Sequence, residues 1–339
     1  MNNDTSIVCT RCYTYNHEPY IKDALNGFAM QKTVFPVVTV VIDDASTDKT
    51  PEVIRQFIKE HCDLQAPEAY EKDTGYAWVT YAPLRTNPNN HFAIVYLKEN
   101  HYSQKKSKLS YLTEWMNPAK YQAFCEGDDY WTDPLKLQKQ VDFLETHPEH
   151  SMCFHKADAI FWPSGELSPL YQNLEEKDYT IDEIAENWIV PTASVVYRSI
   201  FQNKIPINKK FIHGDIVLFL TMATNGKVHC LGDKMSIYRR VSSGSVLTNT
   251  VKDKKSALHN LKLAESWKEM GKCFSVSKRI VQKNIKRFQC FYLSIELRNR
   301  QFKSILFDNT SITLLEKIKL FPLLLENAFK SILSRIKRS

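Results

Sequence analysis

The chain contains little glycine and lacks the loops that most often hold nucleotide phosphates. Only 9 of its 339 residues are glycine, and neither a GxGxxG nor a GxxxxGK[ST] pattern occurs. Kinases, P-loop enzymes and dinucleotide-binding enzymes depend on such loops, so the sequence argues against all three classes. The charge of a phosphorylated substrate would therefore have to be balanced in another way.

Long apolar runs are also absent. No stretch of 18 or more apolar residues occurs, which predicts that no helix spans a membrane. The first five residues, Met-Asn-Asn-Asp-Thr, lack the basic and apolar regions of a secretory signal, so we expect a cytoplasmic protein.

The eight cysteines are scattered, and several fall in strand-like apolar runs. This pattern is typical of reduced, buried thiols. Cys9 and Cys12 form a CxxC, but no second pair completes a zinc site. Because the two lie within and just after a predicted strand rather than at the start of a helix, a redox role is disfavoured.

Charge is distributed unevenly along the chain. The net charge of +7 combines an acidic first part with a basic last part. Residues 252–339 contain 20 Lys and Arg against 7 Asp and Glu, whereas the first 251 residues contain 25 basic and 31 acidic residues. We therefore expect a body at residues 1–250 and a basic, mainly helical region at residues 251–339.

Apolar β-branched runs alternate with amphipathic helical patterns along the body. Strands are predicted at residues 7–10, 37–42, 93–97, 121–125 and 151–161, and as a pair at 228–231 and 235–239. Helices are predicted at residues 20–31, from 50 onward, at 134–147 and at 215–225. This order predicts an α/β fold with a Rossmann-like, mostly parallel sheet flanked by helices. Residues 11–19 are interpreted as a polar loop, and residues 63–92 as an inserted loop or hairpin.

Carboxylates gather where two predicted strands end. Asp43 and Asp44 follow one strand, and Glu126, Asp128 and Asp129 follow another. Ligands of open parallel sheets bind beyond the carboxyl ends of the strands. Three acids within four residues repel one another unless a cation neutralises them, and oxygen ligands suit Mg²⁺ or Mn²⁺. A metal-bridged diphosphate is one interpretation, and an acidic turn that caps the next helix is the alternative.

Asp215 follows His213 and Gly214 at the start of a predicted helix. It could cap that helix. It could also act as a general base that deprotonates an acceptor hydroxyl. The residues alone leave both roles open.

Four segments, taken in order, resemble glycosyltransferase family 2. They are residues 7–10, Tyr15-Asn16, the VVIDDASTD run at residues 40–48 and the EGDDYW run at residues 126–131. The resemblance covers roughly residues 6–247. It implies the GT-A fold and inverting transfer of a sugar from a nucleotide-diphosphate sugar, usually UDP-linked, to a hydroxyl of a glycan or lipid-linked glycan. Bacterial cell-surface polysaccharide synthesis is the implied setting.

The resemblance also implies roles for individual residues. The implied nucleotide-binding residues are Thr10, Tyr15, Asn16, Asp43, Asp44, Glu126, Asp128, Arg239 and Arg240. Asp128 or Asp129 would bind Mn²⁺ or Mg²⁺, and Asp215 would be the catalytic base. Residues 238–240 and 242–245 resemble the segment that closes over the diphosphate, so Arg239 or Arg240 would neutralise it. Glu126 stands where the family more usually has aspartate.

Residues 251–339 contain helical patterns whose apolar positions, such as Ile280 and Phe288, are flanked by lysine and arginine. One interpretation is peripheral attachment to an anionic membrane surface at the inner face of the cytoplasmic membrane, which suits a lipid-linked acceptor. The other is a helical subdomain with a solvated basic face. Nucleic acid is disfavoured as a partner because the aromatic residues lie on the apolar stripes.

Two other functions remain open at this point. A nucleotidyltransferase that makes the activated sugar could share the fold, but such enzymes generally need a glycine-rich loop near the first strand. An inactive binding or scaffold protein of the GT-A fold is the second alternative, and the intact set Asp44, Asp128, Asp129 and Asp215 argues against it.

Overall fold

The chain folds into two compact units. The computed structural model describes residues 7–241, 254–298, 312 and 320. The first unit contains the described residues up to Thr180 together with Ile189–Ile205 and Thr221–Arg240. The second contains Ile181–Trp188, Pro206–Leu220 and the described residues from Val241 onward. A domain boundary near residue 250 stays a prediction.

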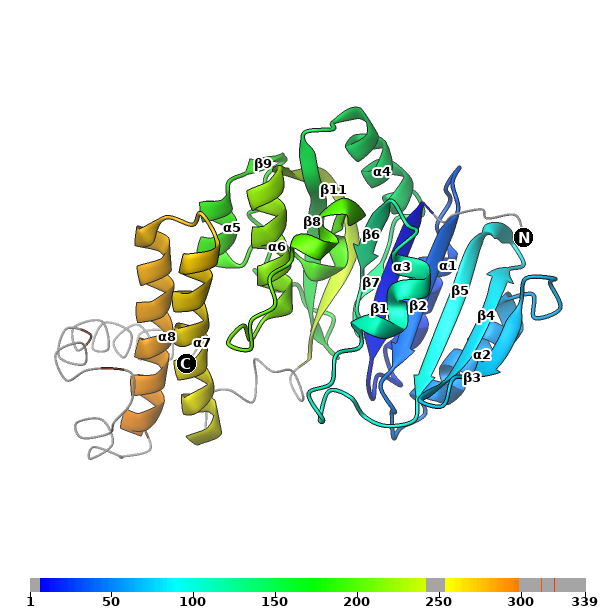
Figure 1. The fold of residues 1–339 in the computed structure, drawn as a ribbon, viewed down its shortest axis with the longest axis horizontal. Coiled ribbons are helices and arrows are strands. Elements are labelled where there is room, and N and C mark those ends of the chain that lie inside the picture. The colour runs from blue at the N-terminus through cyan, green and yellow to red at the C-terminus, as the bar shows by residue number, and fades with distance from the viewer. Residues whose placement is uncertain (1–6, 242–253, 299–311, 313–319, 321–339) are drawn as a thin grey trace. The chain divides into compact units, whose positions relative to one another are not determined.

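One mixed sheet organises the first unit (Figure 1). Its strands are β1 (Val8–Thr14), β2 (Val37–Asp43), β3 (Tyr70–Asp73), β4 (Ala77–Leu84), β5 (Asn87–Leu97), β6 (Tyr121–Phe124), β7 (Tyr130–Trp131), β8 (His150–Trp162), β9 (Lys177–Tyr179), β10 (Val196–Arg198) and β11 (Lys227–Val241). They follow the order β3-β4-β5-β2-β1-β6-β10-β8-β11-β7, and β9 pairs with β11. The central strands β5, β2, β1 and β6 are parallel, as the alternating pattern predicted.

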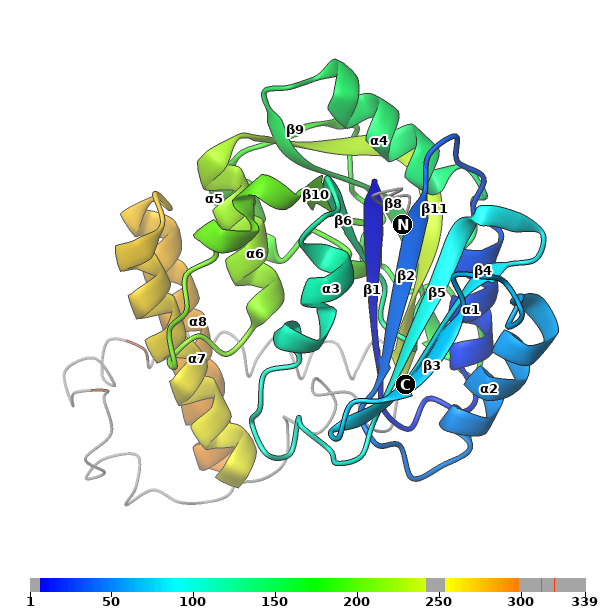
Figure 2. The same ribbon diagram turned by 45° about the vertical axis from the view of Figure 1, so that its right-hand side comes forward.

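Helices cover both faces of the sheet. α1 (Ile21–Ala29), α2 (Thr50–His61) and α4 (Lys136–Thr146) pack their apolar side chains on one face. The short helix η1 (Leu109–Leu112) and α3 (Thr113–Met116) pack on the other face. Figure 2 shows α1 and α2 on one side of the sheet and α3 on the opposite side. Burial of these two apolar layers stabilises the fold, and the predicted α/β architecture is confirmed.

β1 is longer than predicted. The polar loop expected from residue 11 begins only after Thr14, because Arg11 is buried and its guanidinium lies 3.8 Å from the centre of the Phe124 ring. Cys9 and Cys12 are therefore both buried within one strand. All eight cysteines are free thiols, and Cys273 alone is exposed.

Two other segments differ from the prediction. Residues 63–92 are neither a loop nor a lone hairpin, because β4 pairs antiparallel with β5, which begins at Asn87, and β3 pairs antiparallel with β4 at the edge of the sheet. Residues 227–241 form one strand rather than a strand pair. β11 is continuous because its successive parts pair with β9 and β7.

The second unit is helical within its described residues. It contains α5 (Ile181–Asn187), the first part of α6 (Gly214–Asn225), α7 (Lys254–Cys273) and α8 (Lys278–Arg298). α7 and α8 approach closely, since a Cβ at Gly271 would lie 2.7 Å from a Val281 methyl carbon. No helix in the described ranges is long and apolar enough to span a membrane. The shorter elements η2 (Thr192–Ser194), β10 and η3 (Ser199–Lys204) belong to the first unit.

Candidate functional site

The carboxyl ends of β1, β2 and β6 bring the predicted acidic segments to one edge of the sheet. In the parallel registers, Thr14 lies beside Asp43 and Arg11 beside Phe124. The backbone continues this pairing beyond the strands, because the N–H of Asp44 donates to the Thr14 carbonyl at 3.0 Å. The N–H of Gly127 donates to the Tyr13 carbonyl, also at 3.0 Å. We call this the carboxyl edge, and the predicted meeting of the two acidic clusters is confirmed.

Asp129 is the buried acid of the second cluster. Asp129 is 4% exposed, and its carboxylate accepts a hydrogen bond from the backbone N–H of Arg239 at 2.8 Å. Burial, with the added charge of Asp128, raises the pKa of Asp129 well above its ordinary value. Two adjacent ionised carboxylates are therefore costly here without a compensating cation.

Asp128 is the open acid of the same cluster. It is half-buried, and its carboxylate has no hydrogen-bond partner within the described part of the chain. Its charge is felt by the neighbouring Tyr20, whose pKa is raised first by burial and then by Asp128. A carboxylate with free lone pairs beside the buried Asp129 fits a hard divalent cation, so the residues present are compatible with Mn²⁺ or Mg²⁺.

Arg239 supports the acidic loop from within the protein. It is 4% exposed, its Nη1 donates to the Asp128 carbonyl at 3.0 Å, and its Nη2 pairs with the Asp23 carboxylate. The guanidinium also lies 4.3 Å from the centre of the Tyr130 ring. In this arrangement Arg239 positions the loop rather than facing a diphosphate.

Arg240, by contrast, is exposed at its side chain. Its Nη1 donates to the Ser168 hydroxyl at 2.9 Å, and its guanidinium lies 4.8 Å from the Phe161 ring centre. Of the two predicted arginines, Arg240 is the one that an anion can reach. The predicted segment at residues 242–245 lies outside the described residues.

Asp44 holds a neighbouring loop. It is 1% exposed, and its carboxylate accepts the N–H groups of His101 at 2.7 Å and Tyr102 at 3.0 Å. Lys108 Nζ donates to it at 2.8 Å. Burial alone would raise the pKa of Asp44, but the hydrogen bonds from Lys108 and the two N–H groups bring it below its ordinary value. The predicted contact of Asp44 with a base would have to replace one of these donors.

The other predicted nucleotide contacts differ in accessibility. Tyr15 is 42% exposed, and Asn16 accepts the Thr47 N–H at 2.8 Å through its side-chain oxygen. Asp43 is 2% exposed and bonds the Ser46 hydroxyl. Thr10 is fully buried within β1, four residues before the strand ends, so it does not line the carboxyl edge in this conformation. Glu126 is exposed.

Asp215 belongs to the second unit, in the first turn of α6. It is half-buried, its Oδ1 accepts the Ile216 N–H at 2.9 Å, and burial raises its pKa. His213 lies two residues earlier, and burial together with His259 lowers its pKa to about 4. Asp215 is thus within the helix rather than at a capping position before it, and a raised pKa suits a proton acceptor near neutral pH.

Lys108 is a residue of this edge that sequence reasoning did not single out. The signal was present as a lysine-rich loop at residues 104–108 after a predicted strand, but no spacing rule links it to Asp44. Only the ion pair across the end of two strands shows the connection.

Comparison with known proteins agrees with this geometry. Residues 13–67 match the family model described as glycosyl transferase family 2. Uncharacterized protein Mb1547 of Mycobacterium bovis and Uncharacterized protein Rv1520 of Mycobacterium tuberculosis are each 34% identical to the chain over 232 residues. These matches cover 68% of this chain and 58% of each relative, so the chain spans a little over half the length of these curated relatives.

A solved structure shares the fold. The crystal structure of S. aureus TarS 1–349 in complex with UDP-GlcNAc matches 88% of this chain and 75% of its own, with a TM-score of 0.50 and 16% identity. At that identity the likeness shows the fold alone. Residues 13–67 therefore match glycosyltransferase family 2, and the sheet with its flanking helices has the GT-A fold.

Proposed function

We propose that the chain is an inverting, divalent-metal-dependent glycosyltransferase. It moves a sugar from a nucleotide-diphosphate sugar to a hydroxyl of a glycan or lipid-linked glycan. One observation carries this proposal: β1, β2 and β6 end together and bring Asp44, Asp128 and Asp129 to one edge of the sheet. The match of residues 13–67 to glycosyltransferase family 2 supports sugar transfer as the chemistry.

Asp128 and Asp129 are the residues proposed to hold Mn²⁺ or Mg²⁺. A bound divalent cation would act as a Lewis acid on the diphosphate and stabilise the charge of the leaving group. The raised pKa of Asp129 supports this assignment, since burial and Asp128 disfavour two negative charges until a cation compensates them. Arg240, with its exposed guanidinium, is proposed to contact the diphosphate.

Asp215 is proposed to be the catalytic base. The acceptor oxygen attacks the anomeric carbon, the bond from that carbon to the diphosphate oxygen breaks, and the acceptor proton passes to the Asp215 carboxylate. A single displacement of this kind inverts the anomeric configuration. Burial around Asp215 raises its pKa and so makes it a better proton acceptor.

Uridine nucleotides are the first donors to test. The TarS complexes contain UDP-GlcNAc and UDP. Asp44 and Lys108 would read the base together, because one carries acceptors and the other a donor. A role in cell-surface polysaccharide synthesis is also part of the proposal. So is attachment to an anionic membrane through residues 251–339, which vesicle pelleting can test.

The testing experiment measures release of nucleoside diphosphate from UDP-, GDP- and TDP-linked sugars with and without Mn²⁺. The proposal expects metal-dependent release from one donor, lost in Asp128→Asn. A folded protein that binds a nucleotide but releases none from any donor would favour an inactive scaffold. Formation of pyrophosphate and a nucleotide sugar from a nucleoside triphosphate and a sugar phosphate would favour a nucleotidyltransferase instead.

A further inference from the structure

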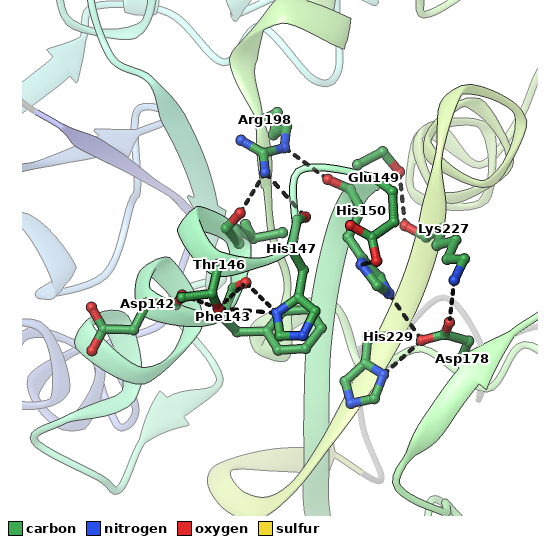
Figure 3. Close-up of polar contacts among 12 residues, drawn as sticks. Asp142, Phe143, Thr146, His147, Glu149, His150, Asp178, Arg198, Lys227 and His229 are labelled. Carbon is green, nitrogen blue, oxygen red and sulfur yellow. Dashed lines mark hydrogen bonds and ion pairs between the residues drawn. The ribbon is translucent and has the colours of Figure 1, made fainter.

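A second cluster of metal-ligand side chains lies at the opposite edge of the same sheet. His150 begins β8, Asp178 lies in β9 and His229 lies in β11 (Figure 3). Strand β10 is antiparallel to both β6 and β8, and it pairs Val196 with Ala123 and with Cys153. β8 therefore runs parallel to β6, and its first residue lies level with the start of β6.

We call the end of the sheet that carries His150, Asp178 and His229 the amino edge. It is distinct from the carboxyl edge, which carries Asp128. In Figure 1, β5 points toward the lower edge of the sheet, whereas β9 lies at the upper edge. A cation held by the histidine cluster would not reach a diphosphate bound beyond the end of β6.

The two imidazoles converge on one carboxylate oxygen. Asp178 Oδ1 accepts from His150 Nε2 at 2.9 Å and from His229 Nδ1 at 2.7 Å. One ligand atom from each of the three residues lies within 4.8 Å of the others. Ligand atoms around a tetrahedral Zn²⁺ with bonds near 2.0–2.1 Å are about 3.3 Å apart, so an expansion of a few tenths of an ångström admits the ion.

The surroundings of the rings also match a metal site. The other ring nitrogen of His150, Nδ1, is 3.5 Å from a Glu149 carboxylate oxygen, and His150 is 4% exposed. His150 Nδ1 makes no hydrogen bond in this structure, so Glu149 is the nearby carboxylate that could accept from it and orient Nε2 toward an ion. Phe143 stacks on His229 with ring centres 4.5 Å apart and meets His150 edge-on at 5.0 Å, which fixes both ring planes.

The charges are suitable as well. The Asp178 carboxylate faces both imidazoles, so it is the one acidic ligand of the set. Lys227 Nζ lies 3.5 Å from the other oxygen of Asp178. Its side chain is 57% exposed and can turn toward solvent when a cation binds.

We propose that His150 Nε2, His229 Nδ1 and the Asp178 carboxylate form a Zn²⁺ site with a fourth position open to water. Two imidazoles and one carboxylate are a ligand set that zinc uses, whereas all-oxygen sites suit Mg²⁺ and Mn²⁺. The ion replaces the two ring protons that now point at Asp178. It ties together the starts of β8, β9 and β11, whose ligands lie 28 and 51 residues apart in sequence. This proposal does not depend on sugar transfer.

The test uses the full chain, stripped of metal by a chelator and shown by circular dichroism to be folded. Co²⁺ is titrated as a spectroscopic probe, and Zn²⁺ is then used to displace it. We expect one of the bound ions to give the absorption spectrum of a tetrahedral nitrogen and oxygen site. His229→Gln and Asp178→Asn should abolish the spectrum, and Glu149→Gln should weaken binding by about 10-fold.

Two variants serve as controls. Asp128→Asn alters the carboxyl edge and should leave the tetrahedral cobalt spectrum unchanged. His147→Gln should also leave it unchanged, because His147 lies beside the cluster but its Nδ1 already contacts the Phe143 carbonyl at 2.9 Å. The proposal is wrong if the folded wild-type chain takes up no Co²⁺, or if His229→Gln binds it equally. It is also wrong if the spectrum shows cysteine thiolate ligands.

Discussion

The two edges of the central sheet carry different chemistry. At the carboxyl edge, Asp128 and Asp129 lie next to each other, and burial with mutual repulsion raises the pKa of the buried one. At the amino edge, Asp178 lies between His150 and His229, and their hydrogen bonds lower its pKa to about 2. The acidic loop of the carboxyl edge therefore gathers carboxylates that repel one another despite the nearby Arg239 guanidinium, whereas the carboxylate of the amino edge already pairs with two imidazoles.

The comparison also separates what a sequence can reveal from what only a fold can. The acids of the carboxyl edge are contiguous and directly follow predicted strands, so a sequence pattern finds them. The residues of the amino edge come from β8, β9 and β11, and no spacing connects them. Antiparallel pairing around β10 and β11 brings them together.

The largest expected effect on activity comes from removing a carboxylate at the carboxyl edge. Asp128→Asn removes the open carboxylate and should lower kcat/KM for sugar transfer by about 1,000-fold, since metal stabilisation of a leaving group contributes several kcal/mol. Steady-state kinetics with the best donor would measure it. Activity within a few-fold of wild type would show that the cation is held elsewhere.

Asp215→Asn tests the residue assigned to proton transfer. It should lower transfer by about 100-fold or more while leaving donor binding unchanged, because a general base acts in the chemical step. Calorimetric titration of the donor nucleotide, run beside the transfer assay, separates the two effects. Near-normal turnover would rule out Asp215 as the base.

Removal of metal should change the thermal stability of the chain through the amino edge and not through the carboxyl edge. If zinc occupies the amino edge at 100 times its Kd, it stabilises the folded chain by about 2.7 kcal/mol. EDTA should therefore lower Tm of the wild-type chain and of Asp128→Asn, but should leave Tm of His229→Gln unchanged. Equal responses in all three would mean that the metal acts at another place.

A smaller effect is expected at Lys136, a buried charge outside both edges. Lys136 is fully buried, bonds Gln140 at 2.7 Å, and its ammonium lies 4.1 Å from the Trp131 ring centre. Burial lowers the pKa of Lys136 from 10.5 to about 7. The unfolded chain then binds more protons than the folded chain between these values, so this residue makes stability rise with pH from about 7 to 10.5.

Lys136→Met should remove that pH dependence and raise the free energy of unfolding at pH 7 by about 1–3 kcal/mol. Lys139→Met is the matched control on the same helix, since Lys139 is partly exposed and pairs with Asp133 and Asp233. It should change stability by less than about 1 kcal/mol. Urea unfolding at several pH values measures both, and a destabilised Lys136→Met would contradict the pKa assignment.

Much of the fold followed from periodicity, and the departures have physical causes. The parallel core and its helices were predicted because strand and helix patterns alternate over the body. β1 extends through Arg11 because Phe124 and Tyr197 accommodate a buried guanidinium, which no local pattern indicates. Residues 63–92 joined the sheet because β5 offers an edge for β4 to pair with.

The site residues also divide into those that the sequence predicts and those that only the structure shows. The meeting of the two acidic clusters could be predicted, since parallel strands end at one edge. The partners of Arg239 and Asp44 could not, because Asp23 and Lys108 reach them from distant parts of the chain. Sequence reasoning thus located the edge and left the orientation of its side chains to the structure.

The most direct test of the carboxyl edge as a donor site is thermal stability of His229→Gln with UDP, GDP, TDP and CDP, each with and without Mn²⁺. This variant lacks a proposed zinc ligand, so a shift caused by Mn²⁺ with a nucleotide reports the carboxyl edge. We predict a rise in Tm with one nucleotide that requires Mn²⁺ and disappears when Asp128→Asn is added. No shift with any of the four nucleotides, in a folded protein, would contradict the account.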